Sequence, residues 1–311
     1  IVKRLIARKA NVHSFSRQFY SKLEKMGVMQ FQGDISDGES IAKALKGMDM
    51  VFHVAAKPGI WGPFDEYYKT NVIGTENIIS ACFENNVGQL IYTSSPSVVF
   101  DGGDMENVDE SVPYSEEYLA SYPRTKAMAE KLVRKAAKKG LKTIILRPHL
   151  IWGPDDNHLV PGIIKRAGRL KRVGRSDDLV DTIYVDNAAF AHVLASEKLS
   201  EDSALSGNIY FISQDEPVSK WEMANAFLAA AGLPPIKGHI SARTAYLAGY
   251  LFEKIYSLLG IKSEPPITRF VAKELATSHW FNISRAKRDL GYFPEISTKE
   301  GLERLEASLT T

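Results

Sequence analysis

Short apolar runs alternate with longer amphipathic segments through the first two thirds of the chain. The clearest run is DMVFHVAA at 49–56, whose near-continuous apolar character is typical of a strand covered on both faces of a parallel sheet. Runs of similar length lie at 12–15, 29–33, 90–94 and 143–146. Since helical segments separate them, the pattern predicts an α/β fold with a doubly wound parallel sheet and right-handed connections.

The remaining elements predict a second, smaller part of the molecule. Helices are expected at 36–46, 64–86 and 123–139, after which prolines and glycines interrupt the pattern between Pro148 and Gly162. Later elements are expected as strands at 181–185 and 208–212, and as helices at 187–196 (with Asp186 as N-cap), 219–231, 241–259, 266–276, 284–290 and 297–308. We therefore expect a sheet domain of residues 1–148 plus 180–212, and a mainly helical lobe of 149–179 plus 213–311.

Composition excludes several classes of protein. The 311 residues carry a formal net charge of +2, so we expect no nucleic-acid partner. One cysteine, Cys82, cannot form an internal disulfide and fits a reducing, cytoplasmic compartment. No apolar stretch reaches the roughly 18 residues of a membrane span, and no signal peptide is visible. The histidines lack metal-ligand spacing, so we expect no metal.

A proton-transfer pair is predicted at the start of the helix at 123–139. Pro123 suits a first helical position, which puts Tyr122 at the helix start and Lys126 one turn further on the same side. A nearby ammonium group favours the phenolate, so Lys126 is expected to lower the pKa of Tyr122 from its reference value of roughly 10.

Hydroxyl groups follow the neighbouring strand. The sequence YTSSPS places Thr93, Ser94, Ser95 and Ser97 at the carboxyl end of the strand at 90–94, which is the edge where open α/β sheets bind ligands. A hydroxyl, a phenol and an ammonium group at one sheet edge form a proton-donating set without a nucleophile–base pair.

These residues resemble a known family. Ser95, Tyr122 and Lys126 match the Ser/Tyr-x-x-x-Lys triad of the extended short-chain dehydrogenases/reductases, and further matches are HVAA at 53–56, NVIGT at 71–75, YTSS at 92–95, LRP at 146–148 and YVDN at 184–187. SSPSVVF, YPRTKAMAEK, RPHLIWGPDD and EPPITRF are similar to the 3β-hydroxysteroid dehydrogenase branch, and within it to the bacterial 2-alkyl-3-oxoalkanoate reductases of olefin biosynthesis.

The resemblance implies a Rossmann-like dinucleotide-binding domain, a substrate lobe and a reaction that interconverts a ketone and an alcohol. Tyr122 would donate the proton, Ser95 would hydrogen-bond the reacting oxygen, and Lys126 would hold the nicotinamide ribose. Asn71 either orders a water that relays protons to Lys126 or is a structural asparagine within a helix. The family's first strand and glycine-rich turn are missing, and since residues 1–8 read as the end of a helix, we expect a segment upstream.

The implied cofactor residues follow the strand ends. They are Ser16, Arg17, Asp34, Ile35, Ala55, Ala56, Lys57, Thr93, Tyr122, Lys126, Pro148, His149 and Leu150. Members that use NAD place an acidic residue after the second strand, whereas Ser16 and Arg17 stand here and suit a 2′-phosphate, so NADPH is favoured over NADH.

Substrate contacts are expected from Trp61, Ser97, Trp152, Tyr246 and Tyr250. The apolar face of the helix at 241–259 either covers the nicotinamide, which suits a long-chain keto acid or a steroid, or is the core of the lobe. His149 and His158 either bind a substrate carboxylate or are packing residues. Arg147 is expected to be structural.

Three other functions remain open at this point. The triad is shared with sterol or steroid 3-dehydrogenases and with nucleotide-sugar epimerases or dehydratases, and the fold also serves non-catalytic dinucleotide sensors. A pocket rich in hydrogen-bonding groups would favour the sugar nucleotide, and loss of the tyrosine or lysine would favour the sensor. The family often dimerises through the two helices expected at 64–86 and 123–139, so a homodimer is expected.

Overall fold

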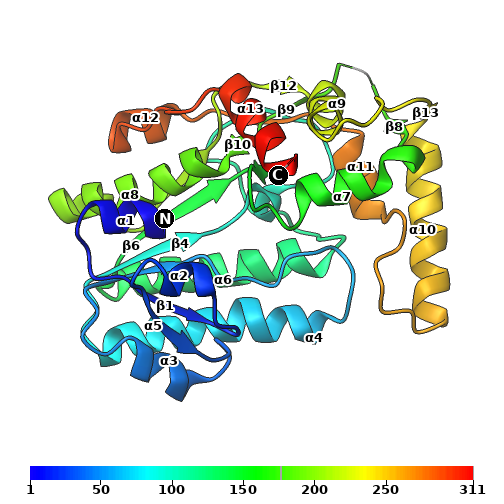
Figure 1. The fold of residues 1–311 in the computed structure, drawn as a ribbon. Helices are drawn as coiled ribbons and strands as arrows, with labels where there is room; N and C mark the ends of the chain where they lie inside the picture. The colour runs from blue at the N-terminus through cyan, green and yellow to red at the C-terminus, as the bar shows by residue number, and fades with distance from the viewer. Residues whose placement is uncertain (176, 311) are drawn as a thin grey trace.

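Parallel strands form the centre of the structure, a computed structural model that describes residues 1–175 and 177–310. A four-stranded parallel sheet has the order β11-β6-β4-β3, and β1 and β2 form a separate parallel pair (Figure 1). The bounds are β1 His13–Ser16, β2 Met29–Gln32, β3 Met50–His53, β4 Gln89–Thr93, β6 Lys142–Pro148 and β11 Asn208–Ile212. The predicted α/β fold with parallel strands is confirmed.

Helices cover both faces of the four-stranded sheet. On one face, α3 (Gly38–Ala44), α5 (Gly74–Glu84) and α6 (Ser121–Lys138) share an apolar cluster with Leu90 of β4. On the other, α8 (Val185–Glu201) packs on Ile91 of the same strand. Consecutive residues of a strand point to opposite faces, which is why a run apolar throughout needs cover on both sides.

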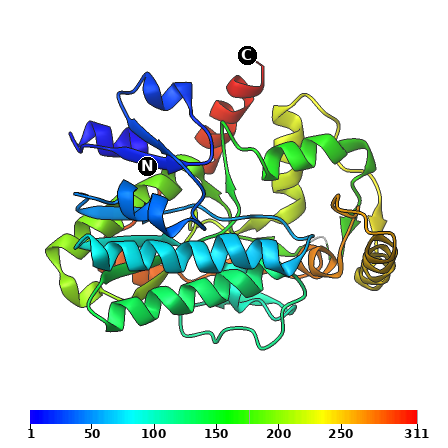
Figure 2. The ribbon, with the colours of Figure 1, turned by 90° about the horizontal axis from the view of Figure 1, so that it is seen from below.

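The helix predicted at 64–86 lies beside α6 and contains a π-helical segment. It consists of α4 (Phe64–Tyr67), the π-helical residues Tyr68–Ile73, and α5. Figure 2 shows these segments running alongside α6 on the outside of the sheet. A π-helical turn within an α-helix often marks a functional site.

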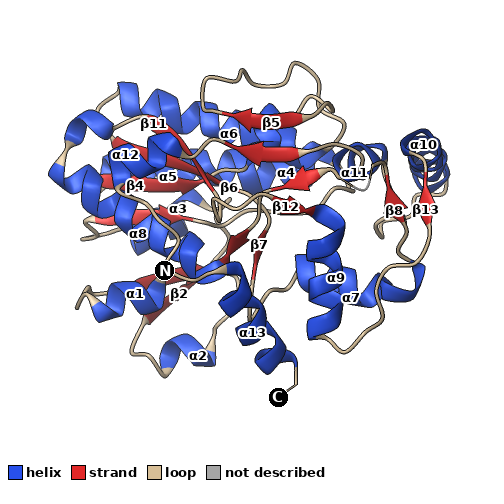
Figure 3. Ribbon diagram, turned by 90° about the horizontal axis from the view of Figure 1, so that it is seen from above, coloured by secondary structure: helices blue, strands red, loops and turns tan. Residues whose placement is uncertain are grey.

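A second, mixed sheet was missed by the sequence analysis. Its order is β12-β9-β14-β5, and two short pairs, β10-β7 and β13-β8, lie in the same half of the molecule (Figure 3). The bounds are β5 Met105–Val108, β7 Ile151–Trp152, β8 Arg172–Val173, β9 Leu179–Val180, β10 Ile183–Tyr184, β12 Val218–Ser219, β13 His239–Ile240 and β14 His279–Phe281. Of these strands only β10 was predicted, within the strand expected at 181–185. Most of the others carry too few residues for a period of two to be recognised.

The other helices are α1 Val2–Ala7, α2 Ser21–Glu24, α7 Leu159–Arg166, α9 Lys220–Ala230, α10 Ala242–Leu258, α11 Arg269–Leu275, α12 Ser284–Leu290 and α13 Thr298–Leu309. The mixed sheet joins β5, from the predicted sheet domain, to β14, from the predicted lobe. The proposed division of the chain into two parts therefore stays a prediction.

Two predicted helix starts need correction. Helix α6 begins at Ser121, so Pro123 is its third residue, which is still within the first turn, where a missing N–H has no cost. Helix α8 begins at Val185 after Tyr184, which makes no side-chain cap bond. Asp186 is thus not an N-cap; its carboxylate lies 3.4 Å from Arg304 of α13.

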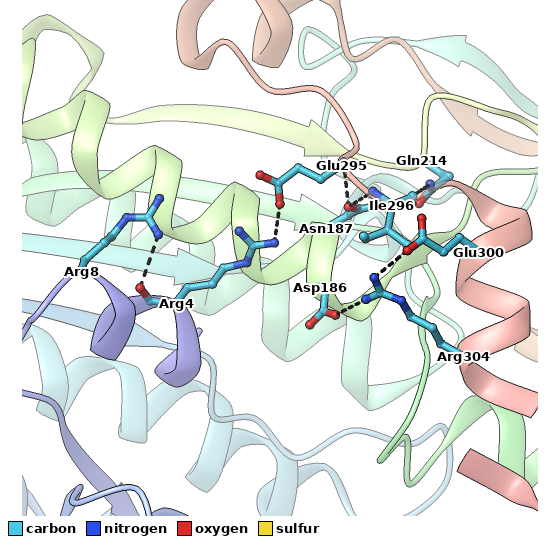
Figure 4. Close-up of polar contacts among 9 residues, drawn as sticks. All are labelled: Arg4, Arg8, Asp186, Asn187, Gln214, Glu295, Ile296, Glu300 and Arg304. Atoms are coloured by element: carbon cyan, nitrogen blue, oxygen red, sulfur yellow. Dashed lines mark hydrogen bonds and ion pairs between the residues drawn. The ribbon is translucent and has the colours of Figure 1, made fainter. Parts of the chain in front are cut away.

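Asn187 of α8 holds the segment before α13. Its Oδ1 accepts hydrogen bonds from the backbone N–H groups of Glu295 and Ile296, and its Nδ2 donates to Gln214 Oε1 and to the Ile296 carbonyl. Nearby, Arg4 of α1 pairs with Glu295 (Figure 4). A buried amide with all these groups paired fixes the carboxy-terminal segment against the sheet.

A buried ion pair joins α6 to the end of β6. Arg147 donates through Nη2 to Glu130 Oε1 at 2.6 Å and through Nε to Oε2 at 3.1 Å, and both side chains are almost fully buried. Ser94 after β4 and Tyr114 also donate to this carboxylate. Arg147 is structural, as predicted, because its charge is neutralised in place.

Replacing Glu130 by glutamine is expected to leave the Arg147 guanidinium buried without a counter-charge. Breaking such a pair costs about 3–5 kcal/mol of the free energy of unfolding. The matched control is Glu300→Gln, which removes the exposed pair with Arg304 and should cost less than about 1 kcal/mol. Urea unfolding measures both; equal losses for the two variants would contradict the role given to Glu130.

Candidate active site

The predicted hydroxyl and phenol meet at the end of β4. Ser95 is the N-cap of the short 3₁₀ helix Pro96–Val99, and its Oγ accepts from the Ser97 N–H and lies 2.9 Å from Ser97 Oγ. Tyr122 lies in the first turn of α6, close enough to Ser95 for that hydroxyl to lower the pKa of the phenol in part. The segment after β4 and the first turn of α6 thus bring the two hydroxyls near each other.

Lys126 lies one turn along α6 and is buried. Its Nζ donates to the carbonyl of Thr93 at 2.6 Å and lies 4.3 Å from the centre of the Tyr92 ring. Burial lowers the pKa of Lys126 to about 7, although the Glu130 carboxylate acts in the opposite direction. Thr93 is itself held by a 2.7 Å contact between its Oγ1 and His192 Nε2.

The expected lowering of the Tyr122 pKa by Lys126 is wrong for this structure. Burial raises the pKa of Tyr122 to about 12, the bond with Ser95 lowers it in part, and Glu274 raises it further. The physical reason is that loss of hydration disfavours both charged forms, the phenolate and the ammonium. The phenol is therefore held in its protonated form.

Asn71, in the π-helical segment, makes structural contacts. Its Oδ1 accepts from the Lys57 N–H at 2.7 Å, and its Nδ2 donates to the Lys57 carbonyl and to Thr125 Oγ1. These bonds tie the loop after β3 to the residue beside Lys126. Of the two roles considered for Asn71, the contacts favour the structural one.

The predicted adenosine contacts lie at the ends of β1 and β2. Ser16 closes β1 and its Oγ donates to the Gln18 carbonyl, while Arg17 is exposed beside it. Hydrogen bonds from the Ser36 N–H and hydroxyl hold the pKa of Asp34 below its usual range, and Lys69 and Arg17 contribute. Arg17 and Asp34 therefore lie within electrostatic range of each other.

The other predicted cofactor residues follow the ends of β2, β3 and β6 and differ in how exposed they are. Ala55 is exposed and Ala56 partly exposed after β3, which permits close approach of a ligand. Ile35 is buried beneath Gly74. Lys57 pairs with Glu66 at 2.9 Å. Pro148 ends β6, and His149 and the exposed Leu150 follow it.

Two charged residues of the lobe were missed. Lys220, at the start of α9, donates through Nζ to the carbonyls of Glu274 and Thr277, each at 2.7 Å. Burial raises the pKa of Glu274 to about 7, and burial lowers that of Lys220 to about 8. Because the Glu274 charge acts on Tyr122, the lobe contributes an ionisable pair beside the catalytic candidate. No motif or spacing in the sequence marks these two residues.

His149 joins the same cluster. Its ring packs edge-on against His279 and Phe281, with ring centres 5.9 Å and 5.3 Å apart. Burial lowers the pKa of His149 to about 3, Lys220 acting in the same direction. The imidazole is therefore neutral, and its buried Nε2 has no hydrogen-bond partner among the residues that the structure describes. His158 lies apart, exposed before α7.

Three residues that were predicted to contact substrate, Trp152, Tyr246 and Tyr250, lie in the part of the chain predicted to form the lobe. Trp152 is fully buried in an apolar cluster with Tyr184 and Phe227, and its Nε1 donates to Thr182, so its prediction is wrong. Tyr246 packs against the core of the lobe, and Tyr250 is half exposed on α10.

Two other residues that were predicted to contact substrate, Ser97 and Trp61, lie in the segments that follow β4 and β3. Ser97 touches Ser95, as described above. Trp61 lies in the loop between β3 and α4, and its Nε1 donates to the Ile261 carbonyl just after α10. The apolar face of α10 is mostly exposed, so it is not the core of the lobe; that it covers the nicotinamide stays a prediction.

One sequence family matches more than two thirds of the chain. Residues 1–239 match the 3-beta hydroxysteroid dehydrogenase/isomerase family. The chain belongs to this family.

Members of the family with named activities cover almost the whole chain. A 2-alkyl-3-oxoalkanoate reductase of Shewanella oneidensis is 48% identical over 99% of this chain and 82% of its own length. One of Stenotrophomonas maltophilia is 46% identical over 98% of this chain and 93% of its own. A decarboxylating sterol-4-alpha-carboxylate 3-dehydrogenase of Mus musculus is 34% identical over 98% and 85%.

A solved structure outside this set shows the same fold. The UDP-glucuronic acid 4-epimerase of Bacillus cereus in complex with NAD superposes with a TM-score of 0.75 at 21% identity, covering 99% of this chain and 93% of the epimerase. Of the helices in residues 1–175 and 177–310, none has the length and apolar character to cross a bilayer. In the same residues, no three His, Cys, Asp or Glu side chains are grouped to hold a metal ion.

Replacing Lys126 by methionine is expected to remove a pH-dependent cost of folding. The unfolded chain holds a proton on this lysine up to pH ~10.4, while the folded chain releases it near pH 7. Between these values the unfolded state binds more protons, so the lysine's contribution to stability rises with pH. The stability of Lys126→Met relative to wild type should therefore fall by about 1–3 kcal/mol between pH 7 and pH 9. Urea unfolding at both pH values measures it, with exposed Lys131→Met as control; equal pH trends in the two variants would contradict the burial argument.

Proposed function

We propose that this protein is an NAD(P)H-dependent reductase that converts the ketone of a 2-alkyl-3-oxoalkanoate to the 3-hydroxy acid. The observation that carries the proposal is that Tyr122 lies beside Ser95, whose hydroxyl lowers the pKa of the phenol in part, one helical turn from buried Lys126. The two reductases that are 46–48% identical over nearly the whole chain support the substrate class.

The residues present fit both ends of a nicotinamide dinucleotide. Arg17 and Asp34 follow β1 and β2, where the adenosine would lie, and Lys126 and Tyr122 lie beyond β4, where the nicotinamide ribose would lie. The exposed backbone at Ala55–Ala56 leaves room between them. When bound, the reduced cofactor supplies the hydride to the carbonyl carbon. We assign no residue to the pyrophosphate.

Tyr122 is the proton donor in this proposal. Reduction of a ketone adds a hydride to carbon and a proton to oxygen, so the donor must be protonated when the substrate binds. A phenol is protonated at neutral pH even at its reference pKa of roughly 10, and the pKa of Tyr122 is raised above that. An alkoxide is a strong enough base to take that proton. Ser95 donates to the same oxygen and stabilises charge as it develops.

Lys126 has a positioning role toward Tyr122 and a binding role toward the ribose. Its bond to the Thr93 carbonyl fixes the ammonium beside the strand end, and Nζ has further N–H groups for ribose hydroxyls. A charge on Lys126 favours the phenolate left after proton donation, so it acts on the product side of the step rather than on the resting phenol.

The sterol dehydrogenase activity is the second candidate. Its supporting observation is the mouse relative, 34% identical over nearly the whole chain. Both substrate classes, as the names of the relatives state them, carry a carboxylate on the carbon next to the reacting one. Two absorbance assays separate them: oxidation of NADPH and NADH with a 2-alkyl-3-oxoalkanoate, and reduction of NADP⁺ and NAD⁺ with a 3-hydroxy sterol 4-carboxylate. Turnover of the sterol alone would overturn the proposal.

Tyr122→Phe is expected to lower kcat by about 10²–10⁴-fold, because general acid catalysis contributes that much. The dissociation constant for the cofactor should stay within about twofold, since the ring remains. Tyr118→Phe is the matched control, as the Tyr118 hydroxyl donates to the Val98 carbonyl, and its kcat should stay close to wild type. Stopped-flow kinetics measures kcat, and fluorescence titration measures the dissociation constant of the cofactor. A near-normal kcat for Tyr122→Phe would exclude the phenol as donor.

Arg17 is proposed to bind the 2′-phosphate of NADPH together with Ser16. Loss of a hydrogen bond to a charged group costs about 1.5–3 kcal/mol, so Arg17→Ala should weaken NADPH binding roughly 10- to 100-fold while NADH binding changes little. Fluorescence titration of both cofactors measures this, with exposed Lys25→Ala as a control of general charge. Equal weakening of NADPH and NADH would show that Arg17 does not select the phosphate.

We also propose a homodimer through the outer faces of α4–α5 and α6. The support is that these helices lie side by side at the surface (Figure 2) and that Phe83 is exposed on α5. A monomer mass in sedimentation equilibrium would contradict it.

A further inference from the structure

Helix α10 has an exposed apolar face that nothing in the described chain covers. Six large apolar side chains on this helix and its C-cap are exposed: Leu247, Tyr250, Leu251, Ile255, Leu258 and Leu259, called here the α10 face. They recur at helical spacing, and Leu258 is 87% exposed. Contiguous exposed apolar groups of this kind mark interaction surfaces.

The helix is attached to the protein by its opposite, narrow side. Ala245 and Gly249 are its buried residues, and a Cβ at Gly249 would meet the backbone of Thr268 and Arg269 at 2.6–2.8 Å. Because α11 and the segment before it approach this closely, α10 is held firmly with its apolar side outward. Figure 1 shows α10 as the outermost element at its edge of the molecule.

The charges around the α10 face are mostly positive. Residues 237–264 contain Lys237, Arg243, Lys254 and Lys262 and two acidic residues, Glu253 and Glu264. Glu264 lies beyond the end of the helix and pairs with Arg166 at 3.7 Å. The Glu253 carboxylate is neutralised, because it accepts from Arg269 Nε at 2.6 Å and from the Arg269 N–H at 2.7 Å.

More cations lie near the start of α10. Strand β13, which leads into the helix, pairs with β8 so that His239 lies opposite Arg172. Lys171 and Arg172 are exposed there. The apolar face is therefore bordered by positive charge at its beginning and carries Lys254 along its length.

This combination selects among the possible occupants. A second copy of the chain packed face to face would bring its cations against those of the first, with no free carboxylate on either face to compensate. A surface that is apolar inside and anionic outside satisfies both features, and an anionic lipid bilayer has that structure.

The same helix borders the candidate active site. Beyond its end, the Ile261 carbonyl accepts from Trp61 Nε1, and the Tyr256 ring packs edge-on against Trp61 with centres 6.2 Å apart. Trp61 lies in the loop that follows β3 and Ala55–Ala56 at the strand ends. A bilayer on the α10 face would thus lie beside the loop that leads to the site.

We propose that the α10 face docks on the surface of an anionic lipid bilayer, with the helix lying in the plane of the interface. The Leu side chains enter the boundary between headgroups and acyl chains, while Arg243 and Lys254 contact anionic headgroups. The 17-residue helix does not cross the bilayer. The docking does not depend on the proposed reaction, since it concerns a surface and not the Ser95–Tyr122 pair.

The test uses the purified full chain and co-sedimentation with vesicles of phosphatidylcholine alone or mixed with phosphatidylglycerol. Wild type should bind the mixed vesicles at low salt, bind the neutral ones less, and lose binding as salt rises. The double variant Leu251→Glu/Leu258→Glu should bind at least about 10-fold more weakly. The control Phe293→Glu, at a residue 60% exposed outside α10, should bind like wild type.

Further measurements keep the result interpretable. Both side chains of the double variant are exposed, so its thermal unfolding should match wild type, which shows that any loss is not unfolding. Lys254→Gln should reduce the preference for anionic vesicles and retain binding to neutral ones. Equal binding by wild type and double variant, or no binding of wild type to either vesicle, would overturn the proposal. Self-association of wild type without lipid that the double variant loses would assign the α10 face to a second copy instead.

Discussion

The attachment of α6 to the ends of β4 and β6 is the constraint on which the site depends. Two buried side chains of α6 make it: Lys126 donates to the carbonyl of Thr93, and Glu130 accepts from Ser94 and Arg147. The helix can then neither slide nor rotate without leaving buried charges unpaired. That fixed position brings the first turn of α6, with Tyr122, to Ser95.

Burial of the same elements sets the protonation states of the phenol and the amine. A phenol whose pKa is raised to about 12 is a poor base at neutral pH but remains available as an acid. An amine whose pKa is lowered to about 7 can be neutral before ligands bind and charged once a negative partner forms nearby. The sequence predicted the pair and its spacing, but it predicted the opposite shift for Tyr122, because a spacing shows which groups are close and not how much water they lose. A raised pKa makes Tyr122 a weaker acid, and the charge of Glu274 acts in the same direction. A charge on Lys126 acts the opposite way, because it favours the phenolate that proton donation leaves.

Features that are continuous along the chain were predictable. Apolar runs located the parallel strands β1 to β4, β6 and β11, and the Tyr122–Lys126 spacing located the pair on one helix. Features that depend on packing between distant segments were not. Trp152 lies two residues after Leu150 in a loop-like sequence, yet it is fully buried against Phe227 of α9. Lys220 and Glu274 come from two lobe helices and meet only in the folded chain.

The lobe shows most clearly what an apolar pattern leaves undetermined. A helix with leucines and tyrosines at 3.6-residue spacing has an apolar face, but periodicity alone does not say whether a protein core, a substrate or a separate surface covers it. For α10 the small residues decide the inner side: Ala245 and Gly249 allow α11 to approach, so the leucines point outward. The charges then narrow what can cover them, because Glu253 is taken by Arg269 and the remaining ions of the helix are positive. The position of Gly249 and the ion pair of Glu253 with Arg269 thus say more about the role of this helix than its hydrophobicity does.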